Sequence, residues 1–247
     1  MSETLHRAYI YQRLRTRGVE PLYLDRAVEH LSYWSERLFD EPFHPDTKAL
    51  NAQIRAALLN EGFSKGGTHA VEVRLYSCGD ILVTPLESLY LESFPLRAIR
   101  PSATPQHLTG ELLLAPTSAK EAMLAICHTA KLLPSQDIPM WIDHNNEITA
   151  IDGAPVIAVM ENEIILSHLG DSVEFELAEQ ALANTTHPMR RGFISCNELP
   201  LVKELLYIDH RGITALNDIE GRQLSNIVAE RIAKEVQKLD NLLSDAQ

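Results

Sequence analysis

The chain has little cysteine, with only Cys78, Cys127 and Cys196 among its 247 residues. An odd number of widely spaced thiols argues against a disulfide framework. Cys127 and His128 are adjacent but would point in different directions on a helix, and the ten histidines form no HxxxH or HxxEH pair. The sequence therefore predicts no metal site. Its reduced thiols are typical of a cytoplasmic protein.

The sequence also lacks an excess of positive charge and long apolar runs. Its formal net charge is −12, whereas a nucleic-acid surface needs clustered Lys and Arg to displace counterions. No apolar run approaches the roughly 18 residues of a membrane span. The opening MSETLHRAYIYQRLRTRG contains no hydrophobic core of a signal peptide. We expect neither a nucleic-acid partner nor a membrane span.

Several catalytic signatures are missing as well. The sequence contains neither GxGxxG nor a Walker A motif, so nucleotide binding through those loops is not supported. GxSxG, the nucleophile elbow of hydrolases, is absent too. A Ser/His/Asp triad stays open, because its members need not be close in sequence.

The composition and periodicity indicate a globular α+β protein. With 45% hydrophobic and 23% charged residues, the chain can build one large or two small domains. Apolar spacing predicts helices at 25–39, capped by Asp25, and at 46–62, capped by Asp46. Alternation and turn residues predict strands at 8–17 and 20–24, paired strands in 68–87, an extended segment at 90–102 and short strands in 138–170. Within 197–225, a helical turn is followed by two strands on either side of a turn at 209–212. Further helices are expected at 118–133, 171–185 and 226–243. We predict an N-terminal domain at 1–112 and a C-terminal domain at 113–247.

Two groups of basic residues admit two interpretations each. Arg13, Arg15 and Arg17 alternate along an expected strand, either as an exposed face or as guanidiniums presented to a carboxylate or phosphate. The turn at Arg211 could bind an anion or only water. Lys120, in APTSAKEAMLAI (115–126), lies in the first turn of an expected helix whose Ser118 and Glu121 fit a capping box.

Lys120 is either an ordinary exposed lysine or an amine that attacks a carbonyl. A first-turn lysine is mildly unfavourable against the helix dipole, which is too weak a signal to identify a function. A catalytic lysine would need a depressed pKa, from burial or from nearby positive charge. The decision therefore depends on the motifs around Lys120.

The order of these motifs resembles that of the class IV aminotransferases. YQRLRTRGVEPLYL (11–24) is similar to the family's F-E-T-x-R-x-x-x-G-x-P-x-x-L, and VEVRLY (71–76) stands where the family has an arginine-bearing strand. Lys120 falls where the family has its Schiff-base lysine. MWIDHNNEITAIDG (140–153), APVIAVMENEIILSH (154–168) and NELPLVKELLYIDHRGITALNDIEGRQL (197–224) follow in the family's order. The resemblance spans most of the chain.

This resemblance implies a pyridoxal-phosphate enzyme of fold type IV. The fold would be that of D-amino-acid aminotransferase, with a smaller N-terminal α/β domain and a C-terminal pseudo-barrel. Lys120 would bind the cofactor and act as general base and acid at the substrate's α-carbon. The family's active site lies between two domains and uses residues from both subunits of a homodimer. Matching positions give Ser172, Ile213 and Thr214 for the phosphate, and Arg13, Arg15, Arg74 and Arg211 for phosphate or substrate carboxylate.

Three family residues are replaced in this sequence. His30 stands where an arginine helps to bind the phosphate, Ala150 where a glutamate pairs with the pyridine nitrogen, and Pro155 where the family has an asparagine. Asp152 lies two positions after Ala150, which in a strand means the same face. We therefore hypothesise that Asp152 takes the pyridine-nitrogen role, because a protonated ring is the better electron sink.

The length favours one branch of the family. At 247 residues the chain is short for a branched-chain aminotransferase. It is nearer to 4-amino-4-deoxychorismate lyase, which makes 4-aminobenzoate and pyruvate for folate synthesis. Alternatives are an aminotransferase for branched-chain or D-amino acids, and a degenerate homologue without catalysis. An unrelated α+β binding protein is a further interpretation. We expect a small amino-acid-like substrate.

Overall fold

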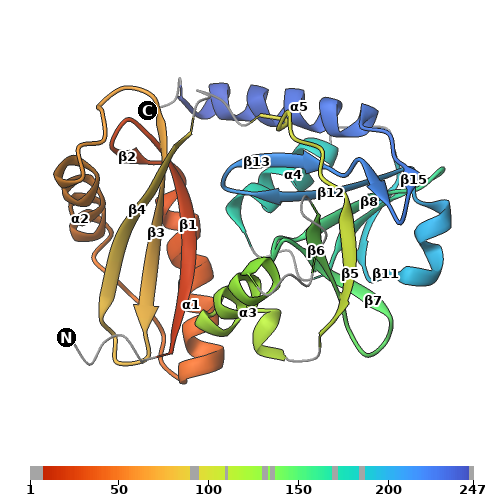
Figure 1. Cartoon of the computed structure of the whole chain (residues 1–247). Coiled ribbons are helices and arrows are strands. Elements are labelled where there is room, and N and C mark those ends of the chain that lie inside the picture. Colours follow the sequence, from red (N-terminus) through yellow and green to blue (C-terminus); the bar gives the residue numbers. More distant parts are fainter. Residues whose placement is uncertain are drawn as a thin grey trace. The chain divides into compact units, whose positions relative to one another are not determined.

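The structure, a computed structural model, describes residues 8–89, 95–108, 111–129, 133, 137–168, 172–183 and 187–244. The chain divides into two compact units. The first comprises Met1–Glu92 and Ala115–Lys120, and the second comprises Ser93–Leu114 and Glu121–Gln247. Helices and three sheets are mixed along the chain (Figure 1), which confirms the predicted α+β class. The domain boundary after residue 112 stays a prediction.

The first unit is built on a four-stranded antiparallel sheet in the order β2-β1-β3-β4. Its strands are β1 (Tyr9–Arg17), β2 (Glu20–Pro21), β3 (Thr68–Tyr76) and β4 (Ile81–Leu89). β1 and β3 pair over their full nine residues, so the alternation of β1 is kept in register with that of β3. The predicted strands at 8–17 and 68–87 are confirmed.

One face of this sheet is apolar and packs against two helices, α1 (Leu24–Phe39) and α2 (Thr47–Asn60). Ile10 and Leu14 of β1 lie on it beside their partners Leu75 and Val71 of β3, and all four are buried. The prediction of Asp46 as a helix cap is confirmed, because its side chain accepts hydrogen bonds from the backbone of Lys48 and Ala49.

The predicted N-cap of the first helix, Asp25, lies two residues after the observed N-cap. Asp25 lies inside the first turn of α1, and the cap position is Tyr23, with φ 56° and no side-chain hydrogen bond to the helix. The extended segment expected at 20–24 is correspondingly short, since β2 ends at Pro21. Asp25 still complements the helix dipole from the first turn.

The second unit contains two sheets. One has the order β10-β9-β8-β12-β13 and the other β11-β7-β6-β5-β14-β15. The strands are β5 (Ala103–His107), β6 (Ile138–Ile142), β7 (Glu147–Ile151), β8 (Val156–Val159), β9 (Ile164–Ser167), β10 (Met189–Gly192), β11 (Ile194–Ser195), β12 (Glu204–Asp209), β13 (Gly212–Ala215), β14 (Asp218–Ile219) and β15 (Arg222–Gln223). The remaining elements are η2 (Glu111–Leu113), α3 (Ser118–Thr129), α4 (Val173–Ala183), η3 (Cys196–Leu201) and α5 (Ile227–Ser244).

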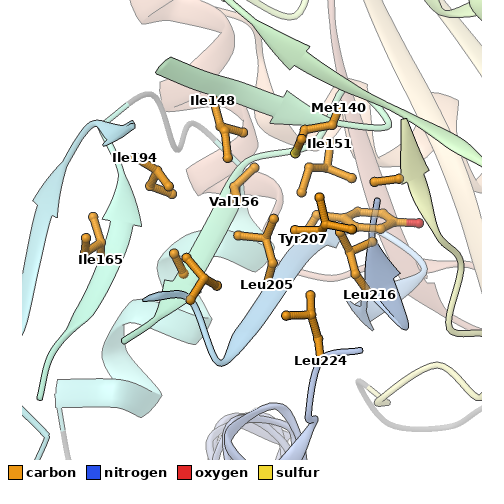
Figure 2. Packing of buried hydrophobic residues seen from close by; sticks show 14 of the residues in the cluster. Met140, Ile148, Ile151, Val156, Ile165, Ile194, Leu205, Tyr207, Leu216 and Leu224 are labelled. Atoms are coloured by element: carbon orange, nitrogen blue, oxygen red, sulfur yellow. The ribbon is translucent and has the colours of Figure 1, made fainter. Parts of the chain in front are cut away.

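Side chains from both sheets form the core of the second unit. Figure 2 shows Ile148 and Ile151 of one sheet gathered with Val156 and Leu205 of the other, and all four are at most 3% exposed. β8 is a continuous apolar run, and so are the four central residues of β12, because both faces of these strands are covered. α4 and α5 pack on each other, α4 also on β12 and α5 on β12 and β13.

Glu204 is a buried carboxylate in this unit. Its oxygens accept hydrogen bonds from the backbone N–H groups of Val228 (2.9 and 3.0 Å) and Ala229 (3.1 Å), and from the Ser225 hydroxyl (2.7 Å). The first N–H groups of a helix have no partners within the helix. Glu204 therefore satisfies the start of α5 from a neighbouring strand.

Among the described residues, no helix is both long and apolar enough to cross a membrane. Within the same part of the chain, no group of three or more His, Cys, Asp and Glu side chains is arranged to hold a metal ion.

Candidate functional site

Lys120 lies in the first turn of α3 and is only 6% exposed. Its backbone N–H donates to the Thr117 hydroxyl at 3.3 Å, so Thr117 rather than Ser118 caps this helix. The segment just before the helix pairs with β1, because the Tyr11 N–H donates to the Pro116 carbonyl at 2.9 Å. The interpretation of Lys120 as an ordinary exposed lysine is therefore wrong. Its amine is held inside the protein at the start of a helix.

The face of the first sheet opposite α1 and α2 carries arginines and tyrosines. Arg13 and Arg15 alternate on it, and Arg74 of β3 lies opposite Tyr11 on the same face. Arg15 is 4% exposed, whereas Arg17 at the end of β1 is exposed. The structure therefore places Arg13, Arg15 and Arg74 on one face of the sheet.

A carboxylate that the sequence motifs did not single out lies between two of these arginines. Glu72 of β3 accepts from Arg13 Nε at 2.8 Å and from Arg74 Nε at 2.6 Å, while its own side chain is 1% exposed. The two guanidiniums also lie over aromatic rings, Arg13 over Tyr11 at 5.0 Å and Arg74 over Tyr9 at 4.7 Å. Only the cross-strand register reveals this arrangement, since Glu72 is 59 positions from Arg13.

Asp152 does not lie on a strand, which corrects the argument that placed it on the same face as Ala150. β7 ends at Ile151, and the next two residues, Asp152 (φ 49°) and Gly153 (φ 73°), form a left-handed turn to Ala154. Ile151 and Ala154 exchange both backbone hydrogen bonds across it. This is the geometry of a two-residue type I′ hairpin, which Asp-Gly favours. Ala150 remains in the strand and is 4% exposed.

Both oxygens of Asp152 have partners in the second unit. His128 Nε2, in the last turn of α3, is 2.8 Å from Oδ1, and Arg211 donates to Oδ2 at 3.1 Å. Arg211 in turn donates its Nε to Asp209 at 2.8 Å and its terminal nitrogen to the same carboxylate. Two residues predicted for different ligands, Asp152 and Arg211, therefore bind each other.

Asp209 is the second acidic partner of Arg211, beside Asp152. Burial alone would raise its pKa, but the charge and hydrogen bonds of Arg211 outweigh burial and hold the pKa of the carboxyl below its usual value. The pKa of Arg211 is raised by Asp209 and Asp152 despite its own burial. Burial also raises the pKa of the neighbouring Tyr207, which hydrogen-bonds Thr214. Asp209 and Arg211 are therefore both charged at neutral pH.

The residues predicted for a phosphate belong to different elements of the structure. The Ser172 hydroxyl accepts from the Phe175 N–H at 3.2 Å, so Ser172 caps α4. The Ile213 N–H already donates to the Pro95 carbonyl at 3.0 Å. Thr214 is fully buried, and its hydroxyl accepts from Arg97 at 3.3 Å. His30 is a partly exposed residue of α1 in the first unit.

These donor sets fit the predicted pyridoxal phosphate in part. A buried primary amine suits an aldehyde, and a carboxylate oriented by an arginine can accept a hydrogen bond from the N–H of a protonated ring nitrogen. Arg97 beside Thr214 adds a cation that the sequence motifs did not indicate. The departure is Asp152, whose oxygens are already engaged by His128 and Arg211.

No protein-family model matches the sequence, and no curated protein matches it. Solved structures do match it. The branched-chain aminotransferase of the archaeon Thermoproteus uzoniensis, solved with norvaline, has a TM-score of 0.74 at 12% identity over 94% of this chain and 84% of its own. A Legionella pneumophila protein described as a 4-amino-4-deoxychorismate lyase has a TM-score of 0.74 at 9% identity, covering 99% and 93%.

A fold IV transaminase from Curtobacterium pusillum is a third match, with a TM-score of 0.70 at 15% identity, covering 95% of this chain and 85% of its own. At such identities the likeness concerns the fold. The chain has the fold of the class IV aminotransferases, which confirms the fold predicted from the order of its motifs.

Proposed function

We propose that the protein is a pyridoxal-phosphate-dependent enzyme that acts on an amino-bearing carboxylic acid. The observation that carries the proposal is the burial of Lys120 in the first turn of α3, at 6% exposure. Lysine side chains are almost always exposed in folded proteins, so the burial of Lys120 sets it apart from the other lysines of a typical chain. In this fold, the resemblance gives that position to the lysine that binds the cofactor.

In the proposed enzyme, the described residues would have separate roles in binding the cofactor and in moving the proton. Bound pyridoxal phosphate would supply the electron sink for the substrate's α-carbon. Lys120 would bind the aldehyde carbon and then carry the proton to and from the substrate. Ser172 and Thr214, with Arg97 beside Thr214, are the candidates for the phosphate, together with Ile213 and His30.

Asp152 would hold a proton on the ring nitrogen, and His128 and Arg211 would fix its orientation. Arg211 would then position Asp152 instead of binding substrate. Arg13, Arg15 and Arg74 would bind the substrate's carboxylate, for which planar guanidiniums are suited.

Within this class we propose a 4-amino-4-deoxychorismate lyase. The match with the Legionella protein covers 99% of this chain and 93% of that one, whereas the archaeal aminotransferase is covered to 84%. A homodimer, a location in the cytoplasm and a domain boundary after residue 112 belong to the same proposal.

Two alternatives keep specific support. Several of the structural matches are aminotransferases, which favours amino transfer to branched-chain or D-amino acids. A degenerate homologue without catalysis is favoured by Ala150, an apolar side chain where the family carries its glutamate. Both alternatives share the fold, so only chemistry separates them.

The test begins with an absorbance titration of the purified protein with pyridoxal phosphate. We expect a cofactor band above 400 nm that is absent from Lys120→Ala and retained in Lys203→Ala, a matched change at an exposed lysine. Pyruvate release from aminodeoxychorismate would then support the lyase, and amino transfer to a 2-oxo acid the aminotransferase. A band without either reaction would support the degenerate homologue. If wild type and Lys120→Ala bind the cofactor equally, the proposal fails.

A further inference from the structure

Glu72 is the most deeply buried charge on the arginine-bearing face of the first unit. Its backbone lies opposite Arg13 in the pairing of β1 with β3, and Arg74 follows two positions later on the same face. Each guanidinium donates its Nε to a different oxygen of the carboxylate, at 2.8 and 2.6 Å. The three side chains, which we call the Glu72 triad, are 32%, 1% and 27% exposed in the order Arg13, Glu72, Arg74.

Stability does not explain this arrangement well. A buried ion pair costs so much desolvation that an apolar replacement is often neutral or stabilising. What the carboxylate does provide is orientation, because one planar group fixes two guanidiniums through separate oxygens. The rings of Tyr11 and Tyr9 hold the same guanidiniums from the side.

We propose that Glu72 is a positioning residue that holds Arg13 and Arg74 as a clamp for one carboxylate group of a ligand. A carboxylate ligand suits the clamp, because planar guanidiniums bind carboxylates through paired hydrogen bonds. A guanidinium has five N–H donors, so a bond through Nε is compatible with bonds to a ligand. The exposed quarter to third of each arginine makes the clamp accessible from solvent.

The identity of the clamp's natural ligand rests on the proposed function, because this ligand would be the carboxylate of the same substrate. Binding of a simple carboxylate does not need the cofactor. The test is therefore calorimetric titration of the whole protein, without added pyridoxal phosphate, with benzoate and with its neutral isostere benzamide. We expect benzoate to bind and benzamide not to bind.

Glu72→Gln separates positioning from simple charge, because the two predict opposite signs. Removing the negative charge would strengthen anion binding if attraction alone mattered. Loss of the fixed guanidiniums should instead weaken benzoate about tenfold, the size expected for charge-assisted hydrogen bonds. Arg17→Gln removes one positive charge from the exposed end of β1 and should change the affinity by no more than about twofold.

Arg74→Lys provides a second variant should Glu72→Gln not fold, because it keeps the charge and removes the planar fork. It should also weaken benzoate. Equal or tighter binding by either variant, or equal binding of benzoate and benzamide by the wild type, would overturn the clamp. Carboxylate binding without a cofactor band would leave the clamp standing and remove the pyridoxal-phosphate function. A cofactor band without carboxylate binding would overturn the clamp and leave the pyridoxal-phosphate function standing.

Discussion

Glu204 illustrates how much one side chain can contribute at a helix end. Replacing it with Gln leaves the N–H groups of Val228 and Ala229 facing a weaker acceptor inside the second unit. We expect Glu204→Gln to lower the free energy of unfolding by about 2 kcal/mol, the range for hydrogen bonds to a buried charge. Urea denaturation followed by circular dichroism measures it. Glu230→Gln, at an exposed position of α5, should change stability by less than about 0.5 kcal/mol.

Asp209 should make stability depend on pH. Its pKa in the folded protein is lowered by Arg211, so its contribution is present above the unfolded pKa of about 4 and is lost as the pH falls through the folded value. At pH 7, Asp209→Asn should cost about 2 kcal/mol, because it leaves the half-buried Arg211 without its main partner. Chemical denaturation from pH 7 to pH 3 checks this.

The difference between wild type and Asp209→Asn should shrink as the pH falls below about 4. A difference that stays constant over that range would contradict the assigned ion pair. Asp40→Asn is the control, since Asp40 is exposed and its left-handed backbone, at φ 58°, also tolerates Asn.

Individual site residues could be predicted from the sequence where they match a position of the family or the two-residue alternation of a strand. Lys120, Arg13 and Arg74 could be named in this way. Glu72 and His128 could not, because their importance arises from partners 59 and 24 positions away. Only a known register or turn brings such pairs together.

At the scale of elements, the β12–β13 turn depends on one glycine. Gly212 has φ 127°, and a Cβ there would lie 2.4 Å from the backbone oxygen of Pro95. That oxygen also accepts the Ile213 N–H, so it cannot move without breaking a hydrogen bond. We expect Gly212→Ala to cost about 2–3 kcal/mol, the strain of a left-handed residue plus this contact.

The measurement is thermal and urea unfolding beside a matched turn variant. Gly79, in the β3–β4 turn, has φ 85° and nothing within 4 Å of an added Cβ. Gly79→Ala should therefore cost only about 1 kcal/mol. Equal losses in the two variants would show that the close approach to Pro95 contributes nothing.

Element boundaries were predictable to the extent that local chemistry decides them. Asp46 and Ser172 do cap their helices. The errors came where the chain turns through left-handed residues, at Tyr23 before α1 and at Asp152 after β7. Asp-Gly at 152–153 predicts a tight turn between two short strands, so the error was to extend the face of the strand through that turn to Asp152.

For the whole molecule, the order of motifs was more informative than any one of them. It predicted the class IV fold, which solved structures with TM-scores of 0.70 to 0.74 confirm at 9–15% identity. The pairing of strands into two sheets in the second unit was not predictable, because its order joins distant segments such as β5 with β14. Apolar periodicity identifies strands but not their neighbours.

The central claim is that Lys120 is the lysine that binds the cofactor. The most direct measurement is borohydride reduction of the protein with pyridoxal phosphate, followed by peptide mass mapping. The account predicts that the added mass falls on the peptide containing Lys120 at one group per chain, and that Lys120→Ala takes up none there. Labelling spread over exposed lysines such as Lys203, with Lys120 unmodified, would contradict it.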